Sequence, residues 1–262
     1  MPENRILTLL TDFGLSDVYV GAIKGAIAQI NPSLAVVDLT HQIPPQNVAA
    51  GSFCLMSAAP YFPTGTVHVA VVDPGVGSHR RAIALETAAS LFVGPDNGLF
   101  TGVLSQNPAI AAVELTNRHY WRTPAPSTTF HGRDIFAPAG AHLASGAPLE
   151  ELGRPIDTAG LAQLPLPALM ATDAGWAGCV QYIDRFGNLI TNIPGSCVAG
   201  RSWEAIAGNL TIKSGQTYSD APAGTPIALI GSSNWVEIAV SGGNAQSQLQ
   251  LNWGEPVRVS LT

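Results

Sequence analysis

Two carboxylates follow apolar segments in the first half of the chain, where an apolar β-strand would end. Asp12 follows residues 6–10, and Asp73 follows residues 67–72. Ligands of open α/β sheets bind beyond the carboxyl ends of the strands, so both carboxylates are candidates for a site. Arg80 follows Asp73 by seven residues. The segment between them contains one proline and two glycines, so it is expected to form a turn rather than a helix. Taken alone, Asp73 fits a turn-capping role equally well.

A histidine lies in a second polar segment, residues 129–134. His131 stands beside Gly132 in an expected loop, from which its imidazole could reach a cleft, although a single loop histidine is more often a surface residue. Asp134 could cap the Ala-rich helix expected after it, and Arg133 could simply pair with Asp134. The segment therefore predicts either a site residue or a helix cap.

Further candidates lie in the second half of the chain. Asn188 carries the paired donor and acceptor that can read a purine edge, and Phe186 could stack on a base. The same residues also suit a β-hairpin turn. Glu237 lies in the apolar run 235–240, where it either faces solvent by alternation or binds a polar group.

Strands alternating with helices must position the first set of residues. Continuous apolar runs between helices predict an α/β domain with a mainly parallel central sheet, covered on both faces. Asp17 opens the first of these helices. The expected strands are 6–10, 35–39, 67–72, 82–86 and 91–93, and the expected helices are 17–30, 48–59 and 135–145.

The character of the sequence changes after a proline-rich stretch. We expect an α/β domain over 1–155, a linker over 156–172 and a smaller all-β, barrel-like domain over 173–262. Short apolar runs separated by Gly, Asn and Ser turns predict strands at 178–183, 189–192, 210–212, 227–230, 236–240 and 256–261.

Composition excludes several classes of partner. A net charge of −6 and the absence of a basic run exclude nucleic acid, and no segment reaches the about 18 apolar residues that cross a membrane. Of the residues, 46% are apolar and only 11% are charged. This composition indicates a homo-oligomer, in which part of the surface of each chain is buried. Three widely spaced cysteines favour the cytoplasm. The histidine spacing matches no metal motif, and no nucleotide-cofactor loop is present, so we expect neither a metal nor a cofactor.

Taken together, the motifs resemble the S-adenosyl-L-methionine (SAM) hydrolases, also called SAM hydroxide adenosyltransferases, which are related to the SAM-dependent chlorinase and fluorinase. The resemblance covers nearly the whole chain in family order. It rests on LTDFG (10–14) with Asp17, DLTH (38–41), VDPGVG (72–77), GPDNG (94–98), FHGRD (130–134), FGN (186–188) and a tail with Ser232, residues 237–240 and 243–245.

The resemblance implies an N-terminal α/β domain, a C-terminal β-barrel and a homotrimer with active sites between subunits. It implies that Asp73, Arg80 and His131 are catalytic; Arg81 is adjacent, but the family's seven-residue spacing favours Arg80. SAM would be substrate rather than cofactor. The halogenases have tyrosine in place of Asp73, and the fluorinase has serine in place of Gly132 and an extra loop.

The resemblance also assigns substrate contacts. Asp12 would hold the ribose hydroxyls, where a fluorinase tryptophan corresponds to Gln46. The other implied contacts are Asp17 and Asp184 near the methionine ammonium, Ser232 near its carboxylate, and Phe186, Asn188 and the strand from Glu237 to Val240 near adenine.

These residues predict attack of an activated water or hydroxide on the ribose C5′ of SAM, giving adenosine and L-methionine. Asp73, Arg80 and His131 would orient that water, because no metal is expected to lower its pKa. Two alternatives stay open. One is SAM-dependent halide transfer, which would give a 5′-halogenated product. The other is a sensor that binds SAM or adenosine without turnover.

Overall fold

The computed structural model describes residues 6–165 and 167–261 and divides the chain into two compact units. One unit ends at Leu164 and the other begins at Pro165, inside the predicted linker. The two-domain architecture is thus confirmed. Residues just before the boundary stay with the N-terminal unit, because the amides of Ala162 and Leu164 donate to Asp96 and Thr101 at 2.8 and 2.9 Å.

The N-terminal domain is built on a seven-stranded mixed sheet, in the order β2-β1-β3-β5-β4-β6-β7. Strands β1, β2, β3 and β5 are parallel neighbours, whereas β4, β6 and β7 pair antiparallel. Their bounds are β1 Leu7–Thr11, β2 Val36–Thr40, β3 Val67–Val71, β4 Ala82–Glu86, β5 Leu91–Pro95, β6 Ala111–Glu114 and β7 Arg154–Pro155.

The prediction of a mainly parallel sheet was therefore wrong. Residues 87–90 alone join β4 to β5, and they close a turn in which the Thr87 amide donates to the Ser90 carbonyl at 2.9 Å. A parallel connection needs about a dozen residues or more, so this link forces a hairpin. Strands buried on both faces have the same apolar pattern in either direction, which is why the pattern did not reveal the reversal.

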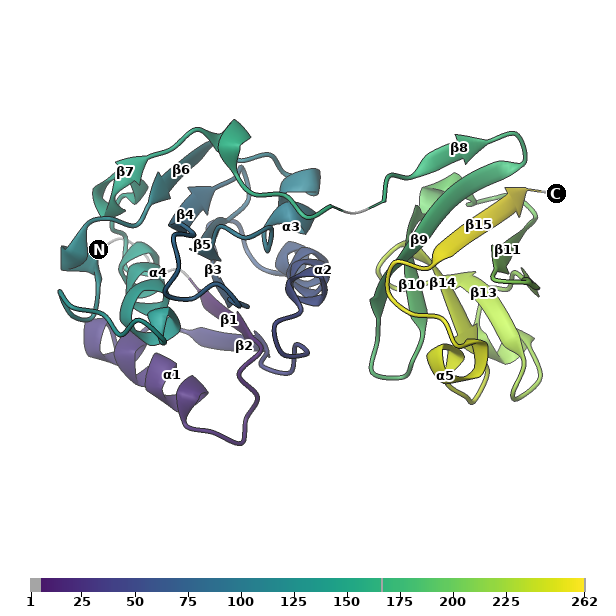
Figure 1. Ribbon diagram of the computed structural model, residues 1–262, viewed down its shortest axis with the longest axis horizontal. Coiled ribbons are helices and arrows are strands. Elements are labelled where there is room, and N and C mark those ends of the chain that lie inside the picture. The colour runs from purple at the N-terminus through teal and green to yellow at the C-terminus, as the bar shows by residue number, and fades with distance from the viewer. Residues whose placement is uncertain (1–5, 166, 262) are drawn as a thin grey trace. The chain divides into compact units, whose positions relative to one another are not determined.

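Helices cover both faces of this sheet (Figure 1). On one side α1 (Tyr19–Ile30) packs with α4 (Ala137–Ala144), and on the other α2 (Val48–Ala58) packs with α3 (Thr101–Gln106). On the first side Leu9 and Val69 share a core with Ile23 and Phe136. Short helices complete the domain: η1 Ala59–Tyr61, η2 Arg118–Tyr120, η3 Gly132–Phe136, η4 Leu149–Leu152 and η5 Thr158–Gly160.

The predicted Ala-rich helix differs at its start. Residues 132–136 form a π-helical turn, η3, and the α-helical part begins only at Ala137. Single π-helical turns recur at functional sites because they shift the side chains that follow. Here the turn begins directly after His131. The sequence analysis also missed α3 and β6, which are too short for a sustained period.

The C-terminal domain is an antiparallel, barrel-like sheet, as predicted, in the order β12-β11-β15-β9-β10-β14-β13 with β8 added to β9. The sheet nearly closes where the Gly215 amide donates to the Ala228 carbonyl at 2.9 Å. The strands are β8 Met170–Thr172, β9 Gly175–Ile183, β10 Leu189–Pro194, β11 Trp203–Ala207, β12 Leu210–Lys213, β13 Pro226–Ile230, β14 Trp235–Val240 and β15 Pro256–Leu261. The helices are η6 Gly195–Cys197, η7 Tyr218–Asp220 and α5 Ala245–Leu249.

Within the described residues, none of the helices has the length and apolar character that a membrane crossing requires.

Candidate active site

Asp73 lies two residues beyond the end of β3, in a tight turn. The Val76 amide donates to the Asp73 carbonyl at 3.2 Å, and the Ser78 amide donates to the Gly75 carbonyl at 3.1 Å. Gly77 has a φ of +79°, and the Thr128 carbonyl oxygen stands 2.5 Å from the place of a Cβ atom. Only glycine fits there, so the turn depends on this residue.

The turn brings Arg80 back onto Asp73. The Arg80 Nε donates to both carboxylate oxygens at 3.0 Å, and Nη2 also contacts Oδ2. The same Nη2 lies 2.8 Å from Nδ1 of His131. The guanidinium is placed 5.2 Å from the ring centre of Phe136, in η3. The three residues predicted to be catalytic therefore form one contact chain.

Arg81 is engaged elsewhere. Its Nε donates to Asp96 at 2.8 Å, and its Nη2 donates to the Gly160 carbonyl at 2.6 Å. These bonds fasten the end of the N-terminal domain to the sheet. The seven-residue spacing that favoured Arg80 over Arg81 thus agrees with the observed contact to Asp73.

The contact with Arg80 determines which ring nitrogen of His131 carries the proton. An arginine guanidinium can only donate, so Nδ1 of His131 must accept, and a neutral ring then carries its proton on Nε2. Burial lowers the pKa of His131 below its ordinary value, and the charge of Arg80 lowers it further, against the opposing charges of Asp73 and Asp134. The neutral ring thus offers one N–H donor.

A pocket of about 510 Å³ lies beside this group. Asp12, Asp73 and His131 all line it, so the two strand-end carboxylates do converge. Arg80 contacts two lining residues without lining the pocket itself. The remaining lining residues are Phe13, Tyr19, Gln46, Val71, Pro74, Val76, Ser127, Thr129, Phe130, Gly132 and Arg133.

Asp12 is oriented by the backbone of Gln46. The Gln46 amide donates to Asp12 Oδ2 at 2.8 Å, and Gln46 adopts a φ of +65°. A left-handed backbone is uncommon for a residue with a side chain, and it often marks a functional position. This bond could not be predicted from the sequence, because its two partners are far apart along the chain.

A polar chain that begins at buried Thr11 and His41 and ends at the solvent-accessible side chains of Asp38 and Lys24 supports the strand end that carries Asp12. The Thr11 hydroxyl lies 2.9 Å from His41 Nδ1, and His41 Nε2 lies 3.1 Å from Asp38, which also accepts from Lys24 at 2.7 Å. The motif at residues 38–41 contributed to the family resemblance without an assigned role. Its histidine and aspartate are now seen to brace β1.

An aromatic group lines another part of the pocket. The rings of Phe13, Tyr19 and Phe130 meet edge to face, with centroids 5.3 to 6.1 Å apart. A Cβ added at Gly132 would stand 3.3 Å from both Phe13 and Ile23. The sequence analysis missed this group, although Phe13 and Phe130 belong to two of its motifs.

Asp17 does not join the pocket of the N-terminal domain. It is exposed in the segment ahead of α1 and is not among the lining residues. Its neighbours Leu15, Val18 and Tyr19 are also exposed, at 65, 80 and 47%.

Three of the predicted residues of the C-terminal domain, Asp184, Phe186 and Asn188, lie in the β9–β10 turn. Asp184 Oδ1 accepts from the amides of Phe186 and Asn188 at 2.9 Å, and Oδ2 accepts from the Asn188 side chain at 3.1 Å. Asp184 thereby orients the Asn188 amide. Phe186 is 75% exposed, so its ring is available to a ligand or a partner.

Glu237 is buried and accepts from the Tyr218 hydroxyl at 2.8 Å. Burial raises the pKa of Glu237, and the charge of Asp184 raises it further although the bond from Tyr218 lowers it. Ser232 is exposed in the β13–β14 turn, next to Gly231, which approaches the Glu237 carboxylate. Val240 points into the core, so only its backbone could face a ligand.

Among the described residues, no group of three or more His, Cys, Asp or Glu side chains is placed to hold a metal ion.

Comparison with known families accounts for most of the chain. The SAM hydroxide adenosyltransferase N-terminal domain matches residues 7–153, and the C-terminal domain of the same family matches residues 178–258. The "(R)-S-adenosyl-L-methionine hydrolase" of Thermus thermophilus is 42% identical over 97% of this chain and 99% of its own. The protein of the same name from Salinispora arenicola is 39% identical over 99% of both chains.

The comparison also finds a halogenating relative and a solved structure. A "Fluorinase" from an Actinoplanes species is 30% identical over 72% of both chains. The crystal structure of an uncharacterized conserved protein from Thermotoga maritima superposes with a TM-score of 0.90 at 35% identity, covering 97% of this chain and all of that one.

Proposed function

The chain belongs to the SAM hydroxide adenosyltransferase family, and we propose that it hydrolyses (R)-S-adenosyl-L-methionine to adenosine and L-methionine. The observation that carries this proposal is the chain Asp73–Arg80–His131, whose two ends line one pocket together with Asp12. The R configuration follows the names of the hydrolase relatives.

The reaction needs an oriented nucleophile more than an activated leaving group. The sulfonium makes C5′ electrophilic, and methionine departs as a neutral thioether. Bulk water is a poor nucleophile, with a pKa of about 15.7. A water molecule beside Asp73 can give a proton to that carboxylate, and its oxygen can accept a hydrogen bond from Nε2–H of His131. Arg80 holds both groups and favours the developing hydroxide.

Asp12 lies in the same pocket and offers its carboxylate to the two ribose hydroxyls, which would align C5′ with the water. Alignment of both reactants supplies a large part of the acceleration in such a displacement. The aromatic group of Phe13, Tyr19 and Phe130 provides apolar surface beside the sugar.

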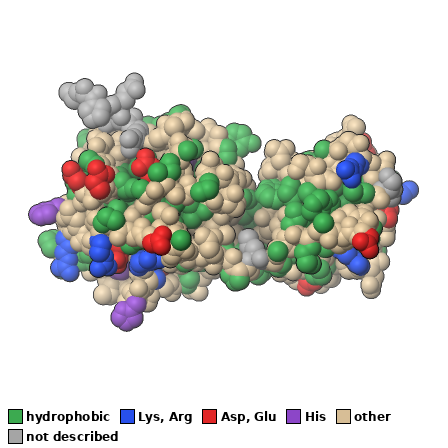
Figure 2. Space-filling view, turned by 90° about the horizontal axis from the view of Figure 1, so that it is seen from above, with side chains coloured by type: hydrophobic (Ala, Val, Ile, Leu, Met, Phe, Trp, Pro, Cys, Tyr) green, Lys and Arg blue, Asp and Glu red, His purple; other side chains and the backbone are tan. Residues whose placement is uncertain are grey.

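Apart from Asp17, the remaining predicted substrate contacts lie in the C-terminal domain. The proposal also includes a homotrimer whose active sites lie at subunit interfaces. Asn188, oriented by Asp184, can read adenine, with Phe186 stacking on it; Ser232, Glu237 and the Val240 backbone complete that surface. Asp17 and Asp184 would face the ammonium. Exposed apolar side chains next to the pocket, Leu15, Val18 and Tyr19, support an interface there. Charged side chains are also sparse on the face that Figure 2 presents.

The proposal includes no cofactor and no metal, with SAM as the substrate. It places the enzyme in the cytoplasm, where its substrate is made and where three widely spaced cysteines stay reduced.

Substitution of Asp73 tests the assignment. Asp73→Asn keeps the size of the side chain and one oxygen for Arg80, but it removes the proton acceptor. We expect kcat for adenosine release to fall about 100-fold or more, with SAM still bound in calorimetry. A variant that binds SAM and keeps the wild-type kcat would refute the catalytic role of Asp73. A wild type that binds SAM but releases no adenosine would favour the sensor.

A further inference from the structure

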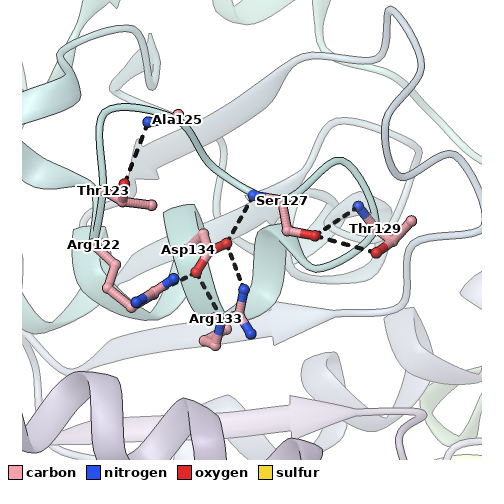
Figure 3. Close-up of polar contacts among 7 residues, drawn as sticks. All are labelled: Arg122, Thr123, Ala125, Ser127, Thr129, Arg133 and Asp134. Atoms are coloured by element: carbon pink, nitrogen blue, oxygen red, sulfur yellow. Dashed lines mark hydrogen bonds and ion pairs between the residues drawn. The ribbon is translucent and has the colours of Figure 1, made fainter.

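Asp134 is a fully buried carboxylate outside the pocket lining (Figure 3). Its Oδ1 accepts from Arg122 Nε at 2.5 Å and from Arg133 Nε at 2.7 Å. Its Oδ2 accepts from Arg133 Nη2 at 2.8 Å and from the Ser127 amide at 2.9 Å. The possible role of Asp134 as a helix cap is not observed, because α4 has no side-chain cap. The possible pairing of Arg133 with Asp134 is observed.

These bonds pin the loop 122–131 at two points. Arg122 is bound at its side chain and also at its backbone, whose amide donates to the Asp134 carbonyl at 2.9 Å. Ser127 is bound at its amide and continues the network through its hydroxyl, which lies 3.2 Å from that of Thr129 (Figure 3). Because Ser127 is bound to Asp134, the segment from Ser127 to Asp134, which includes His131, is closed at both ends and has little freedom left.

The pinned loop forms one wall of the pocket. Ser127, Thr129, Phe130 and His131 all line it, and the Thr128 carbonyl is the atom that approaches Gly77 in the catalytic turn. Arg133, held by Asp134, places its guanidinium 5.0 Å from the ring centre of Phe130. The network is thus connected to His131, to the aromatic group and to the turn behind Asp73.

The electrostatics favour a fixed, charged Asp134. Burial alone would raise its pKa, yet the hydrogen bonds from Arg133, Arg122 and the Ser127 amide hold the pKa well below its usual range. Removal of either guanidinium would leave this buried carboxylate less fully compensated. The charged network therefore has one favoured geometry.

We infer that Asp134 is a positioning residue for the reaction, because it fixes the loop that carries His131 against the catalytic turn. This inference rests on the proposed function for its kinetic readout but not for its structural one. It makes no claim that Asp134 touches substrate. Loosening the loop displaces His131 from Arg80 while the Arg80–Asp73 pair stays bound through its own contacts.

Arg122→Met tests the inference most gently, because Arg122 is 38% exposed at its side chain and Arg133 remains on Asp134. We expect kcat to fall about tenfold or more at a temperature at which circular dichroism shows the variant folded. Arg122→Lys, which keeps the charge, should recover part of that loss. Arg154→Met is the matched control, because it removes an exposed arginine–carboxylate pair with Glu114 in the same domain.

Hydrogen exchange at the Ser127 amide supplies a readout that is independent of SAM. Exchange should accelerate in Arg122→Met and in Asp134→Asn but not in Arg154→Met. If exchange accelerates while folded variants keep the wild-type kcat, or if exchange is unchanged, the positioning role is overturned. If the wild type itself releases no adenosine, the proposed function fails, and accelerated exchange still supports the tether.

Discussion

At the scale of single residues, the protonation of His131 follows from one hydrogen bond. Nδ1 accepts from Arg80, and burial lowers the pKa of His131 below its ordinary value of about 6.5. At neutral pH the ring is therefore neutral. Protonation would place a proton on Nδ1 against the guanidinium and break the contact.

The pH dependence of turnover should reflect this state. We expect kcat/KM to stay level from pH 8 to about pH 6.5 and to fall only below, as His131 becomes protonated. The pH–rate profile of adenosine release checks it. The prediction would be contradicted if kcat/KM fell with an apparent pKa above 6.5 and this fall were absent from a His131→Asn variant. The pKa of His131 would then be raised rather than lowered.

The sequence predicted the residues that meet at the pocket better than it predicted the interactions that hold them there. Asp73, Arg80, His131 and Asp12 do converge, because strand ends and a short turn determine their positions. Of the Asp134 network, the sequence indicated only the pairing with Arg133. The bonds from Arg122 and Ser127 could not be predicted, since a helix cap and a loop tether look alike in sequence. The roles of these residues remain predictions.

At the scale of elements, the turn after β3 depends on Gly77. Gly77→Ala would place Cβ 2.5 Å from the Thr128 carbonyl at a φ of +79°. We expect a loss of about 3 kcal/mol or more in the free energy of unfolding, with reduced turnover. Gly200 is the matched control, because its φ is +72° and nothing lies within 4 Å of a Cβ there.

Gly200→Ala should cost only about 1 kcal/mol, the cost of the left-handed backbone. Urea denaturation of both variants measures the difference between them. Equal losses would mean that the contact between the turn and the loop contributes nothing.

Strand β3 also carries a buried histidine. His68 is fully buried, lies 2.7 Å from the Thr8 hydroxyl, and has no partner for Nε2 among the described residues. Burial lowers the pKa of His68 to about 4. His68 binds a proton more tightly in the unfolded chain than in the folded one. Its contribution to the free energy of unfolding is therefore fully present above about pH 6.5 and is lost as the pH falls toward 4.

The loss through His68 should reach about 3 kcal/mol at pH 4. Denaturant unfolding between pH 7 and pH 4.5 measures it against His68→Gln, which keeps a polar partner for Thr8. We expect a steeper decline in the wild type. Identical slopes would mean that His68 does not titrate on unfolding.

The elements themselves were largely predictable, apart from strand direction. The predicted helices and strands of the N-terminal domain recur within a few residues, because their apolar runs are long. The hairpin of β4 and β5 was missed because burial on both faces hides direction. Strand β11 was missed because Glu and Ala, which are depleted in strands, supply three of the five residues of Trp203–Ala207.

At the scale of the whole molecule, the low charge content and the exposed apolar side chains near the pocket argue for an assembly. Light scattering should give the mass of three chains of 27.2 kDa. If the sites lie between subunits as proposed, activity per chain should fall on dilution together with the trimer. A fully active monomer would contradict the proposed shared sites.

In the proposed reaction water, not halide, attacks C5′. Purified protein incubated with (R)-S-adenosyl-L-methionine in buffer with chloride, followed by chromatography, tests it most directly. We expect adenosine and methionine in equal amounts, released about 100-fold or more slowly by Asp73→Asn. A 5′-chloro product in place of adenosine, or no product after hours, would contradict it.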